Sequence, residues 1–237
     1  MDAFLNDRPV VVAAGMDFEA RLAEGPGIAV VYGQSRCEFR DRLLGYAQTG
    51  CCGLISFGVA GGLAPWLRPG DTVVASAVVT PSGISRTCLA WSKSLLQALP
   101  HARHLPVFGA EAAIESIAEK TAIWKATGAG AVDVESGLAA EIATQYGLPF
   151  AVLRVVLDPA HRTLPPSALA GARDDGKTDP IAVFRSLLTR PQDLPSLILL
   201  AGDARKANRA LLRSRQALGP LFGFVPLEAG QFALNME

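Results

Sequence analysis

The sequence predicts an α/β fold, a three-layer αβα sandwich around a mixed, mostly parallel central sheet. Short apolar or β-branched runs, typical of buried strands, alternate along the chain with segments whose apolar residues repeat at helical spacing. Half of the 237 residues are hydrophobic and 19% are charged, so the chain can bury a sizeable core. We therefore expect a single domain over residues 1–237.

The expected strands are short runs bounded by turn residues, too short to be helices. They are placed at residues 8–14, 27–32, 71–80 and 150–157 and in the two runs that begin at Gly53 and Ala131. Because helical segments separate most of them, parallel pairing is favoured.

Helices are expected between these strands. They are placed around Glu19, up to about residue 48, over residues 90–99, over residues 110–120, and through Leu138, Ile142 and Tyr146. Asp203 is expected to N-cap a final helix through Leu218, which Gly219 and Pro220 would end. Residues 160–180 are rich in proline, glycine and charge, which predicts a mobile loop of the length at which loops often act as lids.

The charge balance gives the chain no overall field that would favour nucleic acid, because 22 basic residues are matched by 22 acidic ones. Residues 1–8 lack the apolar segment of a signal peptide, and no later run reaches the roughly 20 apolar residues of a membrane span. We expect a cytoplasmic protein with a small ligand. Its four cysteines show no metal-ligand spacing and are expected to be reduced thiols, with no metal bound.

Acidic residues and a glycine cluster follow several of the predicted strands. In open α/β sheets, ligands bind beyond the carboxyl ends of the strands. A single acid there has an ordinary structural explanation, since helix first turns favour carboxylates and Asp-Pro opens turns. Together they predict one site in which carboxylates surround a neutral polyol or base. The candidate residues are Glu19, Gly58, Val59, Ala60, Gly61, Asp133, Glu135 and Asp158.

Other ligand-binding motifs are incomplete in this sequence. There is no phosphate-binding loop of the Gly-x-x-x-x-Gly-Lys type and no His-Glu-x-x-His zinc motif. Gly128-Ala129-Gly130 lacks the third glycine of a dinucleotide fingerprint, where Asp133 stands. Gly33-Gln34-Ser35-Arg36-Cys37 has cysteine where a nucleophile elbow needs its last glycine. No nucleotide cofactor is therefore expected.

Four motifs in order carry a resemblance that extends over nearly the whole chain. They are Gly15-Met16-Asp17-Phe18-Glu19, Gly58-Val59-Ala60-Gly61-Gly62-Leu63 with Pro69-Gly70-Asp71, Val132-Asp133-Val134-Glu135-Ser136, and Asp158 after a strand. This set resembles the purine nucleoside phosphorylase and nucleosidase superfamily. Its pattern is similar to the methylthioadenosine/S-adenosylhomocysteine nucleosidases and, more so, to the hopanoid-associated phosphorylases. The latter are favoured by Asp158-Pro159-Ala160 leading to Leu164-Pro165-Pro166 and by residues 204–212.

The resemblance implies an enzyme that cleaves the N-glycosidic bond of a purine nucleoside. By that resemblance Asp158 would protonate purine N7, Glu135 would bind the ribose hydroxyls, and Glu19 would position or activate the nucleophile. Val134 would lie under the sugar beside Asp133, and Phe150 would stack on the base. Adenosylhopane, an adenine nucleoside with a lipid on its 5′ carbon, is the substrate that this branch implies.

Two departures from the family pattern leave the nucleophile open between phosphate and water. Val59 and Leu157 stand where relatives often carry hydroxyl residues, which makes the site more apolar. Arg36, Arg40 and Arg86 are candidate ligands for a phosphate co-substrate, although surface arginines are the commoner explanation. A methylthioadenosine/S-adenosylhomocysteine nucleosidase and a non-catalytic nucleoside-binding protein are the alternatives.

The predicted helix 203–218 carries five basic residues. They are Arg205, Lys206, Arg209, Arg213 and Arg215. Such a cluster can rest on anionic lipid at the inner membrane or form a solvated face, and the modest apolar stripe favours the latter. A homo-oligomer is what the resemblance implies.

Overall fold

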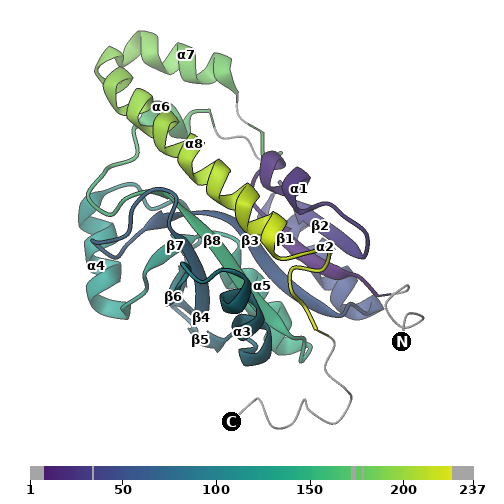
Figure 1. The fold of residues 1–237 in the computed structure, drawn as a ribbon. Helices are drawn as coiled ribbons and strands as arrows, with labels where there is room; N and C mark the ends of the chain where they lie inside the picture. Colours follow the sequence, from purple (N-terminus) through teal and green to yellow (C-terminus); the bar gives the residue numbers. More distant parts are fainter. Residues whose placement is uncertain (1–7, 34, 172–174, 178, 226–237) are drawn as a thin grey trace.

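The computed structural model describes residues 8–33, 35–171, 175–177 and 179–225, and Figure 1 shows their fold. A mixed eight-stranded sheet runs through the described chain in the order β2-β1-β3-β7-β6-β4-β5, and β8 pairs with both β3 and β4. Five of its eight pairings are parallel, which confirms the mixed, mostly parallel sheet. The strands are β1 (Val10–Ala14), β2 (Ile28–Tyr32), β3 (Gly53–Gly62), β4 (Thr72–Thr80), β5 (Gly83–Arg86), β6 (Arg103–Gly109), β7 (Ala131–Asp133) and β8 (Phe150–Asp158).

The middle of the sheet closes into a ring. Because β8 bridges β3 and β4, the strands β3, β7, β6, β4 and β8 form a continuous circuit of hydrogen-bonded neighbours. β1 and β2 extend the sheet beyond this ring, and β5 forms its other edge. The ends of β3, β7 and β8 thereby lie close together, with Gly61 paired to both Val132 and Asp158.

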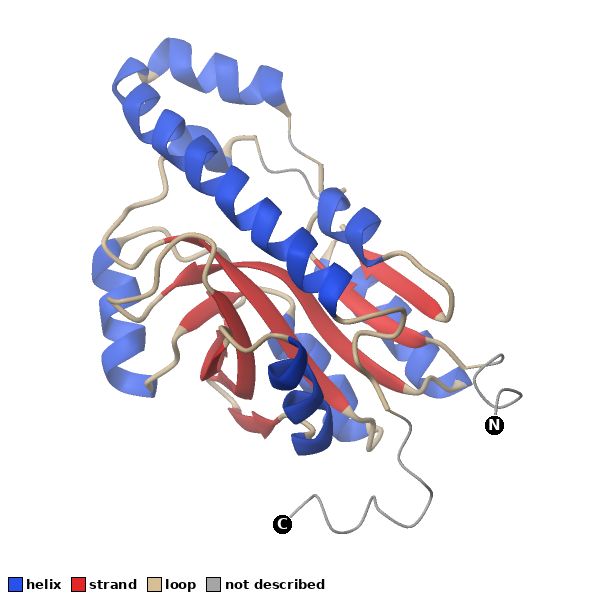
Figure 2. Cartoon of the chain, in the orientation of Figure 1, coloured by secondary structure: helices blue, strands red, loops and turns tan. Residues whose placement is uncertain are grey.

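Helices cover both faces of the sheet, as the three-layer prediction requires (Figure 2). They are α1 (Asp17–Ala23), α2 (Arg36–Thr49), α3 (Leu89–Ala98), α4 (Ile117–Thr127), α5 (Ser136–Gln145), α6 (Pro166–Leu169), α7 (Pro180–Thr189) and α8 (Leu194–Ala217), with a 3-10 turn, η1 (Pro191–Asp193).

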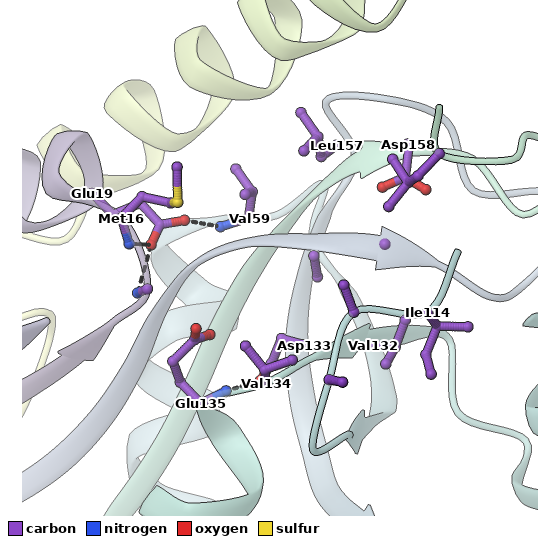
Figure 3. Close-up of a pocket in the computed structure, with 16 residues that line it drawn as sticks. Met16, Glu19, Val59, Ile114, Val132, Asp133, Val134, Glu135, Leu157 and Asp158 are labelled. Carbon is purple, nitrogen blue, oxygen red and sulfur yellow. Dashed lines mark hydrogen bonds between the residues drawn. The ribbon is translucent and has the colours of Figure 1, made fainter. Parts of the chain in front are cut away.

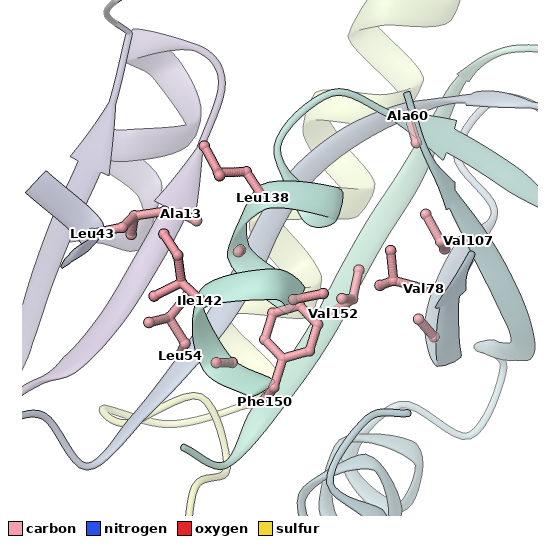
Figure 4. Close-up of a cluster of buried hydrophobic side chains, with 14 of the residues drawn as sticks. Ala13, Leu43, Leu54, Ala60, Val78, Val107, Leu138, Ile142, Phe150 and Val152 are labelled. Atoms are coloured by element: carbon pink, nitrogen blue, oxygen red, sulfur yellow. The ribbon is translucent and has the colours of Figure 1, made fainter. Parts of the chain in front are cut away.

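Among the described residues, the two largest of three buried hydrophobic clusters fill most of the space between sheet and helices. Alternate β1 residues point to opposite faces, so Val11 packs with α2 and α5 whereas Val12 packs with α1, α3 and α8. Figure 4 shows the first cluster, where Leu54, Ile142 and Phe150 meet. These clusters fix the strand ends that bear the acidic residues.

The structure corrects the prediction of a helix over residues 110–120. The segment before Ser116 is a loop, and α4 begins at Ile117 because Ser116 and Glu119 form a capping box. The Ser116 hydroxyl accepts from the Glu119 amide at 3.1 Å, and the Glu119 carboxylate accepts from the Ser116 amide at 3.3 Å. This start leaves residues 112–114 free to line the cavity described below.

The prediction that Asp203 N-caps the last helix is wrong. α8 begins nine residues earlier, after η1, and Asp203 is a buried residue in its middle. Its carboxylate pairs with Arg162, which follows β8, and with Lys206 at 3.1 Å. Asp203 therefore fixes the chain after β8 to α8.

Residues 160–180, expected as one loop, contain α6 and lead into α7. In Figure 1, α6, α7 and the start of α8 project beyond the sheet. Large apolar side chains on this projection face solvent, and we call them the apolar tip: Ile181, Phe184 and Leu188 of α7, and Leu194, Ile198 and Leu199 of α8. In the part of the chain that the structure describes, no helix is long and apolar enough to cross a membrane.

Candidate active site

A cavity of about 310 Å³ lies where the start of α1 meets the ends of β3, β7 and β8. Figure 3 shows its acidic side chains around an otherwise apolar lining. The structure thus brings together acids that are far apart in the sequence. The lining residues are Gly15, Met16, Glu19, Val59, Ala60, Gly61, Ala112, Ala113, Ile114, Val132, Asp133, Val134, Glu135, Leu157, Asp158 and Leu164.

Glu19 is held by the backbone on both sides of its carboxylate. Its Oε2 accepts hydrogen bonds from the amides of Gly15 (2.8 Å) and Met16 (2.9 Å), and its Oε1 accepts from the Val59 amide (2.7 Å). The residue is 1% exposed, and this burial raises the pKa of the carboxyl, an effect opposed by Arg154 and the three amide donors. The helix start and the end of β3 therefore fix one acid at the cavity wall.

Arg154 of β8 joins the acids at the back of the cavity. Its guanidinium, 0% exposed, has Nε 3.0 Å from an Asp133 oxygen and donates through Nη2 to Glu135 Oε2 at 3.0 Å. It also donates through Nη1 to the Val59 carbonyl at 3.2 Å. A buried guanidinium is stable only with such partners, and Asp133 and Glu135 keep its pKa high.

Asp133 and Glu135 differ in how much of each carboxylate is free. Asp133 Oδ1 accepts from the Glu135 and Ser136 amides at 3.0 and 2.7 Å, while its Oδ2 accepts from the Ser136 hydroxyl at 2.6 Å. Asp133 thus secures the start of α5. Burial, with Asp133 and Glu19 nearby, raises the pKa of Glu135 to about 7 against the opposing charge of Arg154.

Asp158, at the end of β8, is 2% exposed and forms an ion pair with the buried Lys120 of α4. Burial raises the pKa of Asp158, while Lys120 and Arg162 oppose that rise. The pairing between β3 and β8 shifts register here, because Ala60 faces Val156 and Gly61 faces Asp158. The shift leaves Leu157 unpaired and directs both Leu157 and Asp158 at the cavity, a common use of bulges beside active sites.

Gly58 is a predicted site residue that lies just behind the cavity wall and does not line it. A Cβ at Gly58 would lie 2.4 Å from Glu19 Oε1 and 2.7 Å from Arg154 Nη1. Glycine is needed here because these two charged groups occupy the space of a side chain. Val59, Ala60, Gly61 and Val134 line the cavity with the four acids.

The stacking role expected for Phe150 does not fit the structure. Phe150 begins β8, at the opposite end of the strand from Asp158, and packs in the core, 4% exposed (Figure 4). The prediction relied on its aromatic side chain. Because β8 runs from Phe150 toward Asp158, Phe150 lies at the end of the strand away from the cavity.

The candidate phosphate ligands Arg36, Arg40 and Arg86 are exposed residues outside the cavity lining. Arg36 starts α2, Arg86 ends β5, and Arg40 pairs with Glu141 at 3.5 Å on the surface. The structure of this chain therefore does not bring them to the acids.

Two buried cations were missed by sequence reasoning. Arg154 interrupts the apolar run of β8, and a charge in the middle of a buried strand is a usable signal for a partnered site. Lys120 follows the Ser116-x-x-Glu119 capping signature by one residue, but nothing in its local sequence indicates burial. Among the described residues, no group of three or more His, Cys, Asp or Glu side chains is placed to hold a metal ion.

Comparison with protein families identifies the class to which this fold and site belong. The model described as the phosphorylase superfamily matches residues 6–188. The chain belongs to the phosphorylase superfamily, which confirms the expected superfamily and an enzyme of that class. Comparison with curated proteins gave no match.

Solved structures with a similar fold include two whose titles name nucleosidases and one whose title names a hydrolase. A putative 5′-methylthioadenosine/S-adenosylhomocysteine nucleosidase from Francisella philomiragia has 17% identity and a TM-score of 0.63, covering 92% of this chain and 100% of its own. The Helicobacter pylori 5′-methylthioadenosine/S-adenosyl homocysteine nucleosidase has 15% identity and a TM-score of 0.62, covering 90% and 97%. The futalosine hydrolase of Helicobacter pylori, as a mutant, has 17% identity and a TM-score of 0.55, covering 63% and 89%. At these identities the likeness shows the fold.

Proposed function

We propose that this chain cleaves the N-glycosidic bond of an adenine nucleoside and releases adenine. The observation that carries the proposal is the set of acids around one cavity, Glu19, Glu135 and Asp158, in a chain of the phosphorylase superfamily. Breaking this bond builds positive charge on the ribose and negative charge on the base. A site for the reaction needs an acid for the base and carboxylates for the sugar, and these three residues supply both.

Each acid has a role that its surroundings support. Asp158 gives its proton to N7 of the base, and burial favours the protonated form that can do so. Glu135 accepts hydrogen bonds from the ribose hydroxyls, since only one of its oxygens is engaged by Arg154. Glu19, fixed by three amides, faces the attacking nucleophile. Asp133 holds the start of α5, and Val59 and Val134 contact the sugar.

Water is the nucleophile that the cavity supports. No lysine or arginine is among its described lining residues, whereas a bound phosphate dianion would need cationic or amide donors. Arg154 is behind the wall, where Nη1 donates to the Val59 carbonyl and Nη2 donates to Ser56 and Glu135. Phosphate-independent release of base is therefore expected.

The substrate's 5′ substituent is proposed to be apolar. Ile114, Leu157 and Leu164 line the cavity, and the chain at Gly176 touches the start of α1, where the Asp17 amide donates to its carbonyl at 3.0 Å. Methylthioadenosine or S-adenosylhomocysteine, named in the titles of similar structures, is one candidate. Adenosylhopane is the one favoured by the sequence motifs after Asp158.

A lipid-linked substrate also fits the surface beside the cavity. Arg205, Lys206, Arg209 and Arg213 are exposed on α8, whereas Arg215 is engaged with Phe222 and the Gly219 carbonyl. The apolar tip lies at the other end of the same helix, with Arg185 and Arg190 exposed beside it. Apolar side chains flanked by cations favour an anionic lipid surface. Sedimentation with vesicles containing phosphatidylglycerol tests this contact, and Phe184→Asp is expected to weaken it.

The deciding experiment measures adenine release from adenosine, methylthioadenosine, S-adenosylhomocysteine and adenosylhopane in detergent, with and without phosphate. Asp158→Asn is expected to lower the rate about 1000-fold, because the base then leaves without its proton. Since Asp158 pairs with buried Lys120, the variant will also lose stability, so its rate is normalised to the folded fraction. Asp41→Asn, an exposed change on α2, is the control.

Three outcomes would contradict the proposal or its details. Retained activity in Asp158→Asn excludes Asp158 as the acid. Release that requires phosphate excludes water as the nucleophile. Tight nucleoside binding in calorimetry with no base released over hours would instead show a non-catalytic binding protein. The homo-oligomer implied by the family resemblance stays a prediction, tested by analytical ultracentrifugation.

A further inference from the structure

Lys120 has the contacts of a buried, fixed ammonium group. Its Nζ contacts Asp158 Oδ2 and donates to the Arg162 carbonyl at 2.8 Å and the Pro159 carbonyl at 3.4 Å. An ammonium has three N–H donors, and each has an acceptor here. The side chain is 0% exposed, so an ammonium without these acceptors would be strongly disfavoured.

Lys120 contacts only one of the two carboxyl oxygens of Asp158, so the other oxygen can carry the proton for the base. Lys120 contacts Oδ2. A Cβ at Gly61, which lines the cavity, would lie 3.5 Å from Oδ1 and 3.7 Å from Oδ2, so the whole carboxyl group is at the cavity wall and Oδ1 is the oxygen that Lys120 does not contact. Lys120 itself is not among the lining residues, so it acts on the reaction only through Asp158.

We propose that Lys120 is a positioning residue for the acid: it orients Asp158 and stabilises the carboxylate that forms when Asp158 gives its proton to the departing base. This inference rests on the proposed function. In the step, the Asp158 O–H bond breaks, the N–H bond at purine N7 forms, and the C1′–N9 electron pair goes to the base. Lys120 keeps its three protons. The proton lost by water on attacking C1′ goes to Glu19 and then to solvent, while Asp158 regains one from solvent.

This arrangement favours the transition state over the bound substrate. A neutral carboxylic acid interacts weakly with an adjacent ammonium, whereas a carboxylate interacts strongly with it at low dielectric. The attraction therefore grows as the proton leaves Asp158, which is the condition for catalysis. The contact between Lys120 and Asp158 is thus present before the reaction and strengthens as the proton is transferred.

Charged groups lie on three sides of Asp158. Lys120 approaches from α4, and Arg162 from the chain after β8 also lowers its pKa. Glu19, Asp133 and Glu135 share the cavity lining, and Arg154 stands behind them. Removing Lys120 takes away the first of these lowering charges, so the pKa of Asp158 should rise further and the acid should become weaker.

The test compares Lys120→Met with Lys125→Met, an exposed lysine of the same helix. Adenine release is measured beside cleavage of a p-nitrophenyl riboside with the same 5′ substituent, whose leaving group needs no proton. Lys120→Met should lower kcat for adenine release about 100-fold, and riboside cleavage less than about 5-fold. The alkaline limb of its kcat/KM profile should move to higher pH. Lys125→Met should match the wild type on every measure.

If Lys120→Met lowers kcat equally for both substrates and leaves the alkaline limb of the kcat/KM profile where it is in the wild type, Lys120 has only a structural role. That result would overturn the proposal. If the wild type rejects the riboside, the pH profile decides alone. Lys120→Gln, which keeps a donor for the Arg162 carbonyl, takes the place of Lys120→Met if the latter does not fold. A wild type that cleaves neither substrate would contradict the proposed function itself, and not the role of Lys120 alone.

Discussion

At the scale of single residues, two buried cations decide what the acids can do. Arg154 contacts Asp133 and Glu135 directly, and its charge also acts on Glu19. Lys120 does the same for Asp158 alone. The acids are thus divided between a group of three, whose carboxyls Arg154 balances, and Asp158, which has its own counter-ion.

Arg154→Met tests how the group of three acids depends on Arg154. The change keeps the apolar stem but leaves three buried carboxyls without their cation, so the free energy of unfolding is expected to fall by about 3–5 kcal/mol. The pKa of Glu135 should rise above its present value of about 7, because Arg154 is the main influence lowering it. Urea unfolding and an infrared titration of the carboxyl bands measure the two effects. Arg103→Met, at an exposed position of β6, should leave both unchanged.

Sequence reasoning found the acids and missed their cations for a physical reason. Glu19 and Glu135 come shortly after β1 and β7, and Asp158 ends β8, so the local sequence places each acid at a strand end. These three strands all pair with β3. The burial of Lys120 depends on where α4 packs against the chain after β8, which is a contact between residues distant in sequence. The prediction for Phe150 was wrong for a different reason. An aromatic residue suits stacking on a base, but Phe150 lies in the core at the start of β8.

At the scale of elements, the end of β3 is the part that tolerates least change. Because Gly58 has no side chain, the charged groups of Glu19 and Arg154 occupy the space where a Cβ at this position would lie. The Val59 amide then holds Glu19, and Gly61 pairs with Asp158 across the bulge. One strand end thereby sets the positions of three of the functional groups.

Gly58→Ala is expected to displace Glu19 and lower the rate of adenine release at least about 10-fold, since small misplacements in a site have large effects on rate. Gly45→Ala is the matched control, because Gly45 lies in α2 with open space around its Cα. That control should raise the free energy of unfolding by about 0.5–1 kcal/mol and leave the rate unchanged. An active Gly58→Ala enzyme would show that Glu19 can move without consequence.

Most strands and the helices packed on them were predictable, because short apolar runs and helical spacing are local properties. The start of α4 was also local, in the Ser116 capping box, but the apolar residues before it suggested a longer helix. The start of α8 was not predicted because Asp203, a good capping residue, is instead buried by its pairing with Arg162.

At the scale of the whole molecule, the three acids of the site bind protons more tightly in the folded protein than in the unfolded chain. Burial raises the pKa values of Glu19, Glu135 and Asp158 above those of the unfolded chain. The folded protein therefore holds protons that the unfolded chain releases as pH rises past about 4.5. These three residues thus favour the folded state at mildly acidic pH and lose that effect as the folded site ionises.

The free energy of unfolding should accordingly fall as pH rises from about 5 to about 8. For Glu135 the window extends from its unfolded pKa of 4.5 to about 7, so its contribution is on the order of 3 kcal/mol at about 1.4 kcal/mol per pKa unit. Urea unfolding at several pH values measures the slope. Glu135→Gln should make the slope smaller, because an amide does not titrate, whereas Glu141→Gln at the exposed face of α5 should leave it as in the wild type. A stability that increases over this window would mean that these acids are ionised in the folded protein. Asp158 could then deliver a proton only after substrate binding had raised its pKa.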